Sequence, residues 1–254
     1  MKEKNNYREL LWLIAVTDFK LRYHGSMLGY LWTLLKPLAL FGVMFVVFSL
    51  FMKMNIPHYQ LYLLLGIMLW NFFAEATMAG VHALASKVGI IKKIYFPRII
   101  VVIASTISAF IGLFFNLIIF AIFFAFSGLA LSWNMLFFPL LILGLYFFVL
   151  GLSLLLSVLY VLFRDLNQVW DVLLQIGFWL TPIIYSLQFV PTQFHFWLFL
   201  NPMTGYIQYA RLLMIEQQIP TFSGVAYLAL FSLGSLLLGY TLFQRYEFLA
   251  PEKL

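Results

Sequence analysis

Long apolar runs alternate with short charged segments along the whole chain. A helix of about 20 apolar residues is long enough to cross the hydrocarbon core of a bilayer. Six runs are of about that length, at residues 31–51, 61–82, 99–127, 136–163, 169–187 and 224–243. The pattern therefore predicts an all-α integral membrane protein with six transmembrane helices.

The segment before the first run is basic and polar, and a Gly25-Ser26 break followed by Tyr30 and Trp32 leads into the run. Basic and amphipathic aromatic residues concentrate where a helix enters a bilayer. We therefore expect an N-terminal cytoplasmic interfacial helix within 1–30 and a six-span domain at 31–254. The residues assigned to the surface of this helix are Asp18, Lys20, Arg22 and Tyr23.

The apolar face of this first helix is imperfect. Trp12, Val16 and Phe19 follow helical spacing, but Leu10 and Ile14 lie off that face. We therefore expect a partner protein or the chain's own spans to cover part of the helix.

Residues 188–223, between the fifth and sixth runs, hold two apolar pieces that are too short to span, 194–200 and 206–215. Asn201-Pro202 separates them. Short apolar helices at a membrane edge lie in the interface or re-enter, so this segment is expected to cap the outer side. The residues assigned to the cap are Asn201, Pro202, Arg211 and Glu216. Arg211 and Glu216 either pair with each other or meet a substrate, and the pattern does not choose between these roles.

The composition supports the membrane assignment. Hydrophobic residues make up 64% of the chain and charged residues 9%, against roughly 25% charged residues in a soluble domain. The net charge of +6 does not indicate nucleic-acid binding, because the basic residues are spread over the segments between apolar runs.

The basic residues also indicate orientation. Of the 15 lysines and arginines, only Lys53 and Arg211 fall outside if the N-terminus is inside, which leaves 13 on the cytoplasmic side. The positive-inside rule then places both termini in the cytoplasm of a multi-pass protein of the cytoplasmic (inner) membrane.

The sequence contains no G-x-x-x-x-G-K-[ST] phosphate loop and no cysteine, and its four histidines lack metal-ligand spacing. We expect no metal site and no nucleotide hydrolysis by the chain itself, so active transport would draw on an ion gradient or a separate ATPase. An ion-coupled carrier would need carboxylates inside the membrane. Glu75 and Asp171 are the candidates, and Glu75 could equally bond to a neighbouring helix.

Four short motifs occur in order along this topology. They are Asp18-Phe19-Lys20-Leu21-Arg22-Tyr23 with Gly25-Ser26 and residues 28–32, Phe96-Pro97-Arg98, Arg164-Asp165 with residues 179–183, and Asn201-Pro202-Met203. With them the chain resembles the six-span permease subunits of ABC-2 type exporters, most closely those for O-antigen or teichoic acid polysaccharides.

The resemblance implies a homodimer that binds two copies of a cytoplasmic ABC ATPase. ATP and magnesium would bind to the ATPase, so this chain would have no cofactor and would not be an enzyme. The substrate would be a lipid-linked, undecaprenyl-linked glycan moved outward. The alternatives are an ABC-2 exporter of a lipid or drug, an ion-coupled secondary transporter, and a non-transporting membrane subunit.

The basic connection at 86–98 is the first candidate for ATPase coupling. The resemblance favours a coupling helix here, whereas topology alone would equally allow a plain positive-inside loop. The residues assigned to it are Lys87, Ile90, Ile91, Lys92, Lys93, Tyr95, Pro97 and Arg98. The resemblance makes the Arg164-Asp165 turn a second contact, and the alternative is a solvated pair.

The fifth run carries polar and aromatic residues at helical spacings of three and four, namely Gln168, Asp171, Gln175, Phe178 and Trp179. The first run offers an aromatic series at similar spacings, Phe41, Phe45 and Phe48. A polar face is costly in lipid, so we expect both series to line a substrate channel at a dimer interface. The alternative for the rings is core packing.

Overall fold

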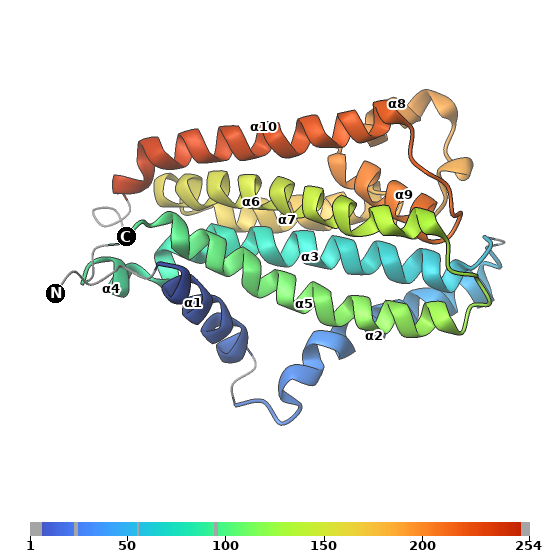
Figure 1. The fold of residues 1–254 in the computed structure, drawn as a ribbon, viewed down its shortest axis with the longest axis horizontal. Coiled ribbons are helices and arrows are strands. Elements are labelled where there is room, and N and C mark those ends of the chain that lie inside the picture. The colour runs from blue at the N-terminus through green and yellow to red at the C-terminus, as the bar shows by residue number, and fades with distance from the viewer. Residues whose placement is uncertain (1–6, 23–24, 55, 94–95, 250–254) are drawn as a thin grey trace.

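The computed structural model describes residues 7–22, 25–54, 56–93 and 96–249, and every regular element in that part of the chain is helical (Figure 1). The first half contains α1 (Tyr7–Arg22), α2 (Trp32–Phe45), α3 (Tyr59–Ser86), α4 (Val88–Ile91) and α5 (Ile99–Ala125). The second half contains α6 (Phe138–Leu162), α7 (Leu166–Leu180), α8 (His195–Phe199), α9 (Pro202–Met214) and α10 (Phe222–Tyr246).

Short helical turns extend several of these helices or stand between them. A 3-10 turn at Gly29–Leu31 leads into α2, which continues as a π-helical turn at Val46–Phe51. Other 3-10 turns are Trp133–Phe137 before α6, Leu187–Phe189, Thr192–Phe194, and Glu247–Leu249 after α10.

Within the described residues, five helical segments are long and apolar enough to cross a membrane. They are Gly29–Phe51, Tyr59–Ser86, Ile99–Ala125, Trp133–Leu162 and Phe222–Tyr246. They confirm the all-helical membrane fold and five of the six predicted spans, with ends that differ from the predicted ones by a few residues.

The fifth predicted span is not one continuous helix. α7 begins at Leu166 instead of residue 169 and ends at Leu180 instead of residue 187. Its 15 residues cover roughly 22 Å at 1.5 Å per residue, which is less than the roughly 30 Å of a hydrocarbon core. The helix ends here because Thr181 precedes Pro182 and adopts an extended conformation, with ψ at 134°.

α3 is the central helix of the bundle. In the most apolar 18-residue stretch of α3, 78% of the residues are buried, against 11% in that of the α2 segment and 17% in that of α10. α3 packs against α2, α5, α6, α7 and α9. A helix that is apolar on all sides can be buried in this way, so the outer helices are left to face lipid.

Close packing of small residues joins α6 to α10. A Cβ atom on Gly239 would lie 2.0 Å from the carbonyl oxygen of Gly151, so no larger residue fits at that crossing. Ser232 adds a hydrogen bond from its hydroxyl to the carbonyl oxygen of Gly144 at 3.0 Å. Small residues and hydroxyl hydrogen bonds are the usual means of helix association in lipid.

The bundle itself covers one side of α1. Ile14, Ala15 and Phe19 are buried, and Leu10 packs against the same core cluster, which includes residues of α5. Trp12 and Leu13 remain exposed. The expectation that the chain's own spans cover part of this helix is therefore confirmed.

The two short helices expected between the fifth and sixth spans are present as α8 and α9. α9 does not lie on the surface, because Met203, Tyr206, Ile207 and Ala210 are buried and the helix packs against α3, α6 and α10.

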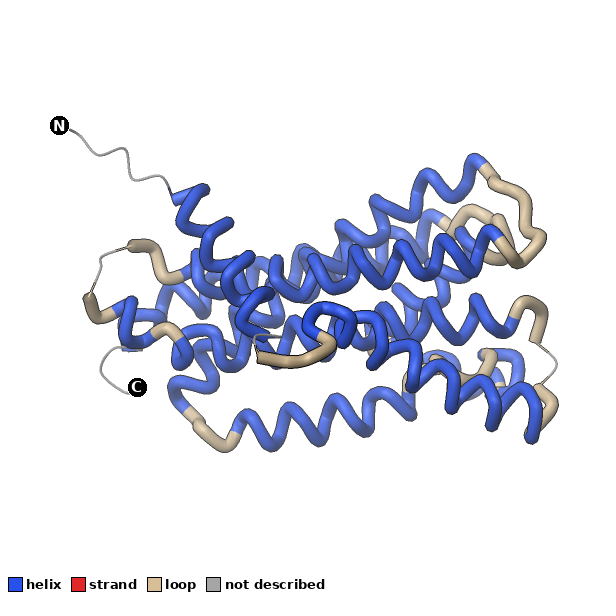
Figure 2. The backbone as a smooth tube through the Cα atoms, turned by 90° about the horizontal axis from the view of Figure 1, so that it is seen from below, coloured by secondary structure: helices blue, strands red, loops and turns tan. Residues whose placement is uncertain are grey.

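α1 begins and α10 ends at the same end of the bundle, where α4 also lies (Figure 1). We call this the N/C end, and the opposite end, which carries α8 and α9, the distal end. Figure 2 shows the same arrangement from below, with the long helices running between the two ends.

Candidate functional site

Three polar residues of α7 face away from the protomer. Gln168, Asp171 and Gln175 are exposed, and Gln175 Nε2 donates to Asp171 Oδ2 at 2.8 Å. Trp179, one turn further, is 59% exposed. We call these four residues the α7 stripe. The structure brings them together on one open face, as their spacing predicted.

The adjacent face of α7 holds the helix on α3. Trp170 Nε1 donates to Thr77 Oγ1 at 3.0 Å, and Leu174 is buried. The ring of Phe178 meets Trp70 edge-on, with centroids 6.2 Å apart. The assignment of Phe178 to the polar face is therefore corrected, because its ring is part of the contact between α7 and α3.

The phenylalanines of the first span pack inside the protomer. Phe41 is 7% exposed and meets Phe123 of α5 edge-on, with centroids 5.6 Å apart. Phe45 stacks on Tyr59 at 6.3 Å, and Phe48 is partly buried against the same core. For Phe41 the channel assignment is corrected in favour of core packing, since α2 turns this ring toward α5. The structure does not join this series to the α7 stripe, because α2 and α7 pack on α3 separately.

The basic connection after α3 forms the short helix α4 at the N/C end. Lys87 forms an ion pair with Asp18 of α1. This contact joins a residue assigned to ATPase coupling to one assigned to the N-terminal helix. Ile91 packs against the core, whereas Ile90, Lys92 and Lys93 are exposed. Tyr95 lies outside the described residues.

The end of this connection is tied to the last span. Pro97 is exposed, and Arg98 Nη1 donates to the carbonyl oxygen of Glu247 at 2.7 Å. Burial raises the pKa of the Glu247 carboxyl, and the nearby Arg98 guanidinium opposes that rise. Arg98 therefore joins the start of α5 to the end of α10.

The turn between α6 and α7 is the second candidate contact at the N/C end. Arg164 and Asp165 are exposed. His82 Nε2 and Asn167 Oδ1 lie 2.8 Å apart, which ties the start of α7 to α3. The turn therefore has a fixed position relative to the central helix.

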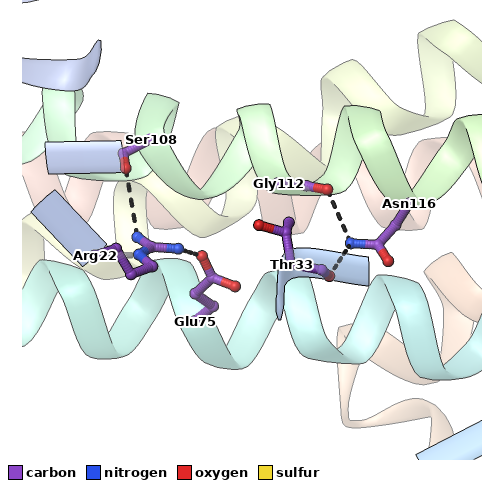
Figure 3. Close-up of polar contacts among 6 residues, drawn as sticks. All are labelled: Arg22, Thr33, Glu75, Ser108, Gly112 and Asn116. Carbon is purple, nitrogen blue, oxygen red and sulfur yellow. Dashed lines mark hydrogen bonds and ion pairs between the residues drawn. The ribbon is translucent and has the colours of Figure 1, made fainter. Parts of the chain in front are cut away.

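The charged residues of α1 hold that helix on the bundle. Arg22 forms an ion pair with Glu75 of α3, and its Nη2 donates to Ser108 Oγ of α5 at 3.4 Å (Figure 3). Lys20 is exposed, and Tyr23 lies outside the described residues. Of the two possibilities left open for Glu75, the structure shows contact with a neighbouring helix.

Arg211 is buried, with 1% of its surface exposed. Its Nη1 donates to the carbonyl oxygen of Pro182 at 2.6 Å and its Nη2 to that of Ile183 at 2.7 Å. Its Nε and Nη2 also donate to the carbonyl oxygen of Tyr62, at 3.1 and 3.0 Å. The contacts with Pro182 and Ile183 satisfy backbone carbonyls of the non-helical segment after α7, and those with Tyr62 tie this segment and α9 to α3.

From the sequence, Arg211 was expected to pair with Glu216 or to meet a substrate. In the structure its N–H groups donate to backbone carbonyls instead. Glu216 is exposed at the end of α9. The Thr181-Pro182 pair was the signal for this role: a proline in an apolar run frees carbonyl groups, which then need a donor.

Asn201 and Pro202 start α9. Asn201 Oδ1 accepts from the backbone N–H of Met203 at 3.1 Å, and Asn201 Nδ2 donates to Thr181 Oγ1 at 2.9 Å. Pro202 occupies the first turn of the helix, where a missing N–H has no cost. The pair caps α9 and fixes it to the end of α7.

Residues 9–215 match the family described as ABC-2 type transporter. The O-antigen export system permease protein RfbA of Klebsiella pneumoniae is 27% identical over 201 residues, which cover 78% of this chain and 77% of the relative. RfbA of Myxococcus xanthus is 27% identical over 222 residues, which cover 87% and 85%.

A further relative is the polysialic acid transport protein KpsM of Escherichia coli. It is 24% identical over 246 residues, which cover 92% of each chain. The family match covers α1 to α9 and most of the described bundle. The chain therefore belongs to the ABC-2 type transporter family.

Proposed function

We propose that this chain is the membrane permease of an ATP-driven exporter that moves a lipid-linked polysaccharide, such as an undecaprenyl-linked O-antigen or teichoic acid, out of the cytoplasm. The single observation that carries the proposal is the open α7 stripe on a helix of an ABC-2 family bundle. Exposed polar groups at membrane depth are costly when they face lipid, at several kcal/mol each, so they are expected to face a hydrated path.

The proposal includes a sixth crossing, which the direction of the chain supports. α6 ends at the N/C end and α10 begins at the distal end (Figure 1), so the chain between them must traverse the bundle. In the proposal α7 and the irregular residues 181–186 make this crossing together. The carbonyl contacts of Arg211 support it, because non-helical backbone is tolerated at membrane depth when it is buried and satisfied.

A homodimer would close the translocation path. A second copy related by a twofold axis would bring two α7 stripes face to face, and two such faces can enclose a path that neither encloses alone. The aromatic ring of Trp179 would offer the apolar faces of sugars a stacking surface.

The N/C end would face the cytoplasm and bind two copies of a separate ABC ATPase. Ile90, Lys92 and Lys93 at the end of α4 are exposed beside a connection held by the Asp18 ion pair. The Arg164-Asp165 turn would be a second, smaller contact. ATP and magnesium would bind to the partner, and this chain would transmit the motion.

The names of the relatives favour a polysaccharide over a drug or a simple lipid, since they refer to O-antigen and polysialic acid. An ion-coupled carrier is less well supported, because Glu75 is paired with Arg22. A proton relay needs an ionisable residue inside the membrane that is available for transport, whereas the Glu75 carboxylate holds α1 on α3 through Arg22.

Reconstitution in liposomes tests the proposal. The permease together with its ATPase should move a lipid-linked polysaccharide only when ATP is present, and the permease alone should not. Gradient-driven transport by this chain alone would contradict the proposal. ATP-dependent movement of a drug or phospholipid without any glycan transport would contradict the proposed substrate.

A further inference from the structure

A cavity of about 350 Å³, lined by both polar and apolar residues, lies where the end of α1 meets α2, α3 and α5. Small-molecule sites have volumes of roughly 300–1,000 Å³, so the cavity is large enough for a small polar group. Its polar lining consists of Arg22, Thr33, Lys36, Asn71, Glu75 and Asn116. None of these residues belongs to the α7 stripe or to the basic connection at 86–98, which we call the coupling segment.

Three buried polar atoms of this lining have no hydrogen-bond partner within the described protein, and one of them, Glu75 Oε1, is paired with Arg22. The other two are the hydroxyl oxygen of Thr33 and Oδ1 of Asn116, residues that are 6% and 7% exposed. A buried polar group without a hydrogen bond costs about 1–3 kcal/mol, so such groups point to a missing partner.

The orientation of the Asn116 amide is determined by its contacts. Its Nδ2 donates to the carbonyl oxygens of Gly112 at 2.9 Å and of Thr33 at 3.4 Å (Figure 3). A reversed amide would place an oxygen against two carbonyl oxygens, so Oδ1 is the free atom. It can only accept, and the missing partner must therefore carry an N–H or O–H donor.

The charges of the lining are unbalanced. Arg22 and Glu75 neutralise each other in their ion pair, and no ion pair of Lys36 is found in the described part of the chain. This leaves one positive charge on an exposed side chain near the start of a membrane-spanning segment. Trp32, which is also exposed, lies on the preceding turn of α2. Lysine and tryptophan are enriched where helices meet lipid headgroups.

We propose that this cavity binds the headgroup of a membrane phospholipid that carries both a phosphate and a hydrogen-bond donor. Lys36 binds the phosphate at the exposed side. The hydroxyl or ammonium group of the headgroup enters the cavity and donates to Asn116 Oδ1, with the Thr33 hydroxyl as a second contact. The surrounding helices span the membrane, so a lipid can reach the cavity from the bilayer.

The proposal predicts lipid selectivity in the unmodified protein. Phosphatidylethanolamine and phosphatidylglycerol have donor groups, whereas the quaternary ammonium of phosphatidylcholine has none. In native mass spectrometry of the purified full chain, the donor-bearing lipids should bind at least about fivefold more tightly than phosphatidylcholine with the same acyl chains, because one neutral hydrogen bond corresponds to about fivefold and a charged ammonium donor to more. Equal binding of the three lipids would overturn the proposal.

Two variants test the assigned contacts. Thr33→Val removes a hydroxyl that has no protein partner, so it should leave thermal stability in detergent unchanged or higher while weakening the binding of both donor-bearing lipids. Lys36→Gln should weaken binding of all phospholipids about fivefold or more. Lys53→Gln is the matched control, since it removes the same charge from an exposed residue outside the cavity.

Other outcomes exclude the proposed site. Equal lipid binding by Lys36→Gln and Lys53→Gln would mean that lysine attracts lipid only by general charge. Unchanged selectivity in Thr33→Val, together with reduced stability, would assign the hydroxyl to the fold. Displacement of the lipid by glycerol phosphate at the same concentration would identify a soluble phosphate as the ligand and overturn the lipid assignment.

Discussion

The guanidinium carbon of Arg211 lies 3.3 Å from the centroid of the Tyr62 ring, and the same guanidinium donates to the backbone carbonyl oxygen of Tyr62. The contact joins α9 to the first turn of α3. Through Pro182 and Ile183 the guanidinium also holds the irregular segment after α7. One side chain thus fixes three parts of the distal end.

Replacing Arg211 with methionine should strongly destabilise the protein. The apolar side chain keeps much of the volume but leaves the carbonyls of the non-helical residues Pro182 and Ile183 without these donors. We expect a loss of about 3 kcal/mol or more in unfolding free energy, since each buried unsatisfied group costs about 1–3 kcal/mol. Thermal unfolding in detergent measures the effect. Arg245→Met, at an exposed residue of α10, is the control and should change stability by about 0.5 kcal/mol or less. Equal stability of the two variants would contradict this role for Arg211.

The neighbouring residues Phe178 and Trp179 allow a matched test of the translocation path. Phe178 packs on Trp70, so Phe178→Ala should cost about 3–5 kcal/mol in stability. Trp179 is exposed in the protomer, so Trp179→Ala should leave the protomer stable and slow ATP-dependent glycan export. Stability and export are measured on the same preparations. A stable Trp179→Ala variant with normal export would remove this residue from the path.

Reversing the exposed lysines of the coupling segment should separate hydrolysis from transport. Lys92→Glu with Lys93→Glu changes two surface charges without touching the buried helices, so the permease should fold normally and fail to export. The readouts are thermal stability, binding of the ATPase, and glycan export in liposomes. Lys53→Glu, at the other end of the bundle, is the charge control. Normal export by the double variant would place the ATPase contact elsewhere.

The orientation of the bundle can be tested by cysteine labelling, because the chain contains no cysteine. Lys92 is exposed at the N/C end and Gln218 is exposed beyond α9, near the distal end. A membrane-impermeant reagent added to intact cells should label Gln218→Cys and should label Lys92→Cys only after the membrane is opened. The reverse pattern would place the termini outside. Arg211 is unsuitable for this test because its side chain is buried.

The sequence by itself determined the elements that depend on local composition. Apolar length predicted five of the membrane-spanning helices, since a run of about 20 apolar residues has no other low-energy place than a bilayer or a protein interior. Helical spacing also predicted the shared face of Gln168, Asp171 and Gln175. The break at Thr181-Pro182 was visible too, although hydropathy alone carried the predicted span past it to residue 187.

Only the tertiary structure decided which side chains face inward and which ones meet. The series that begins with Phe41 has helical spacing similar to that of the α7 stripe. Only the packing of α2 on α5 shows that the ring of Phe41 is buried. The contacts of Arg211 with Tyr62 and of Arg22 with Glu75 join residues far apart in the chain. Local sequence fixes the period of a helix but not its rotation about its own axis, which is set by neighbouring helices. For this reason the roles of Arg211 and Glu75 became clear only from the folded bundle.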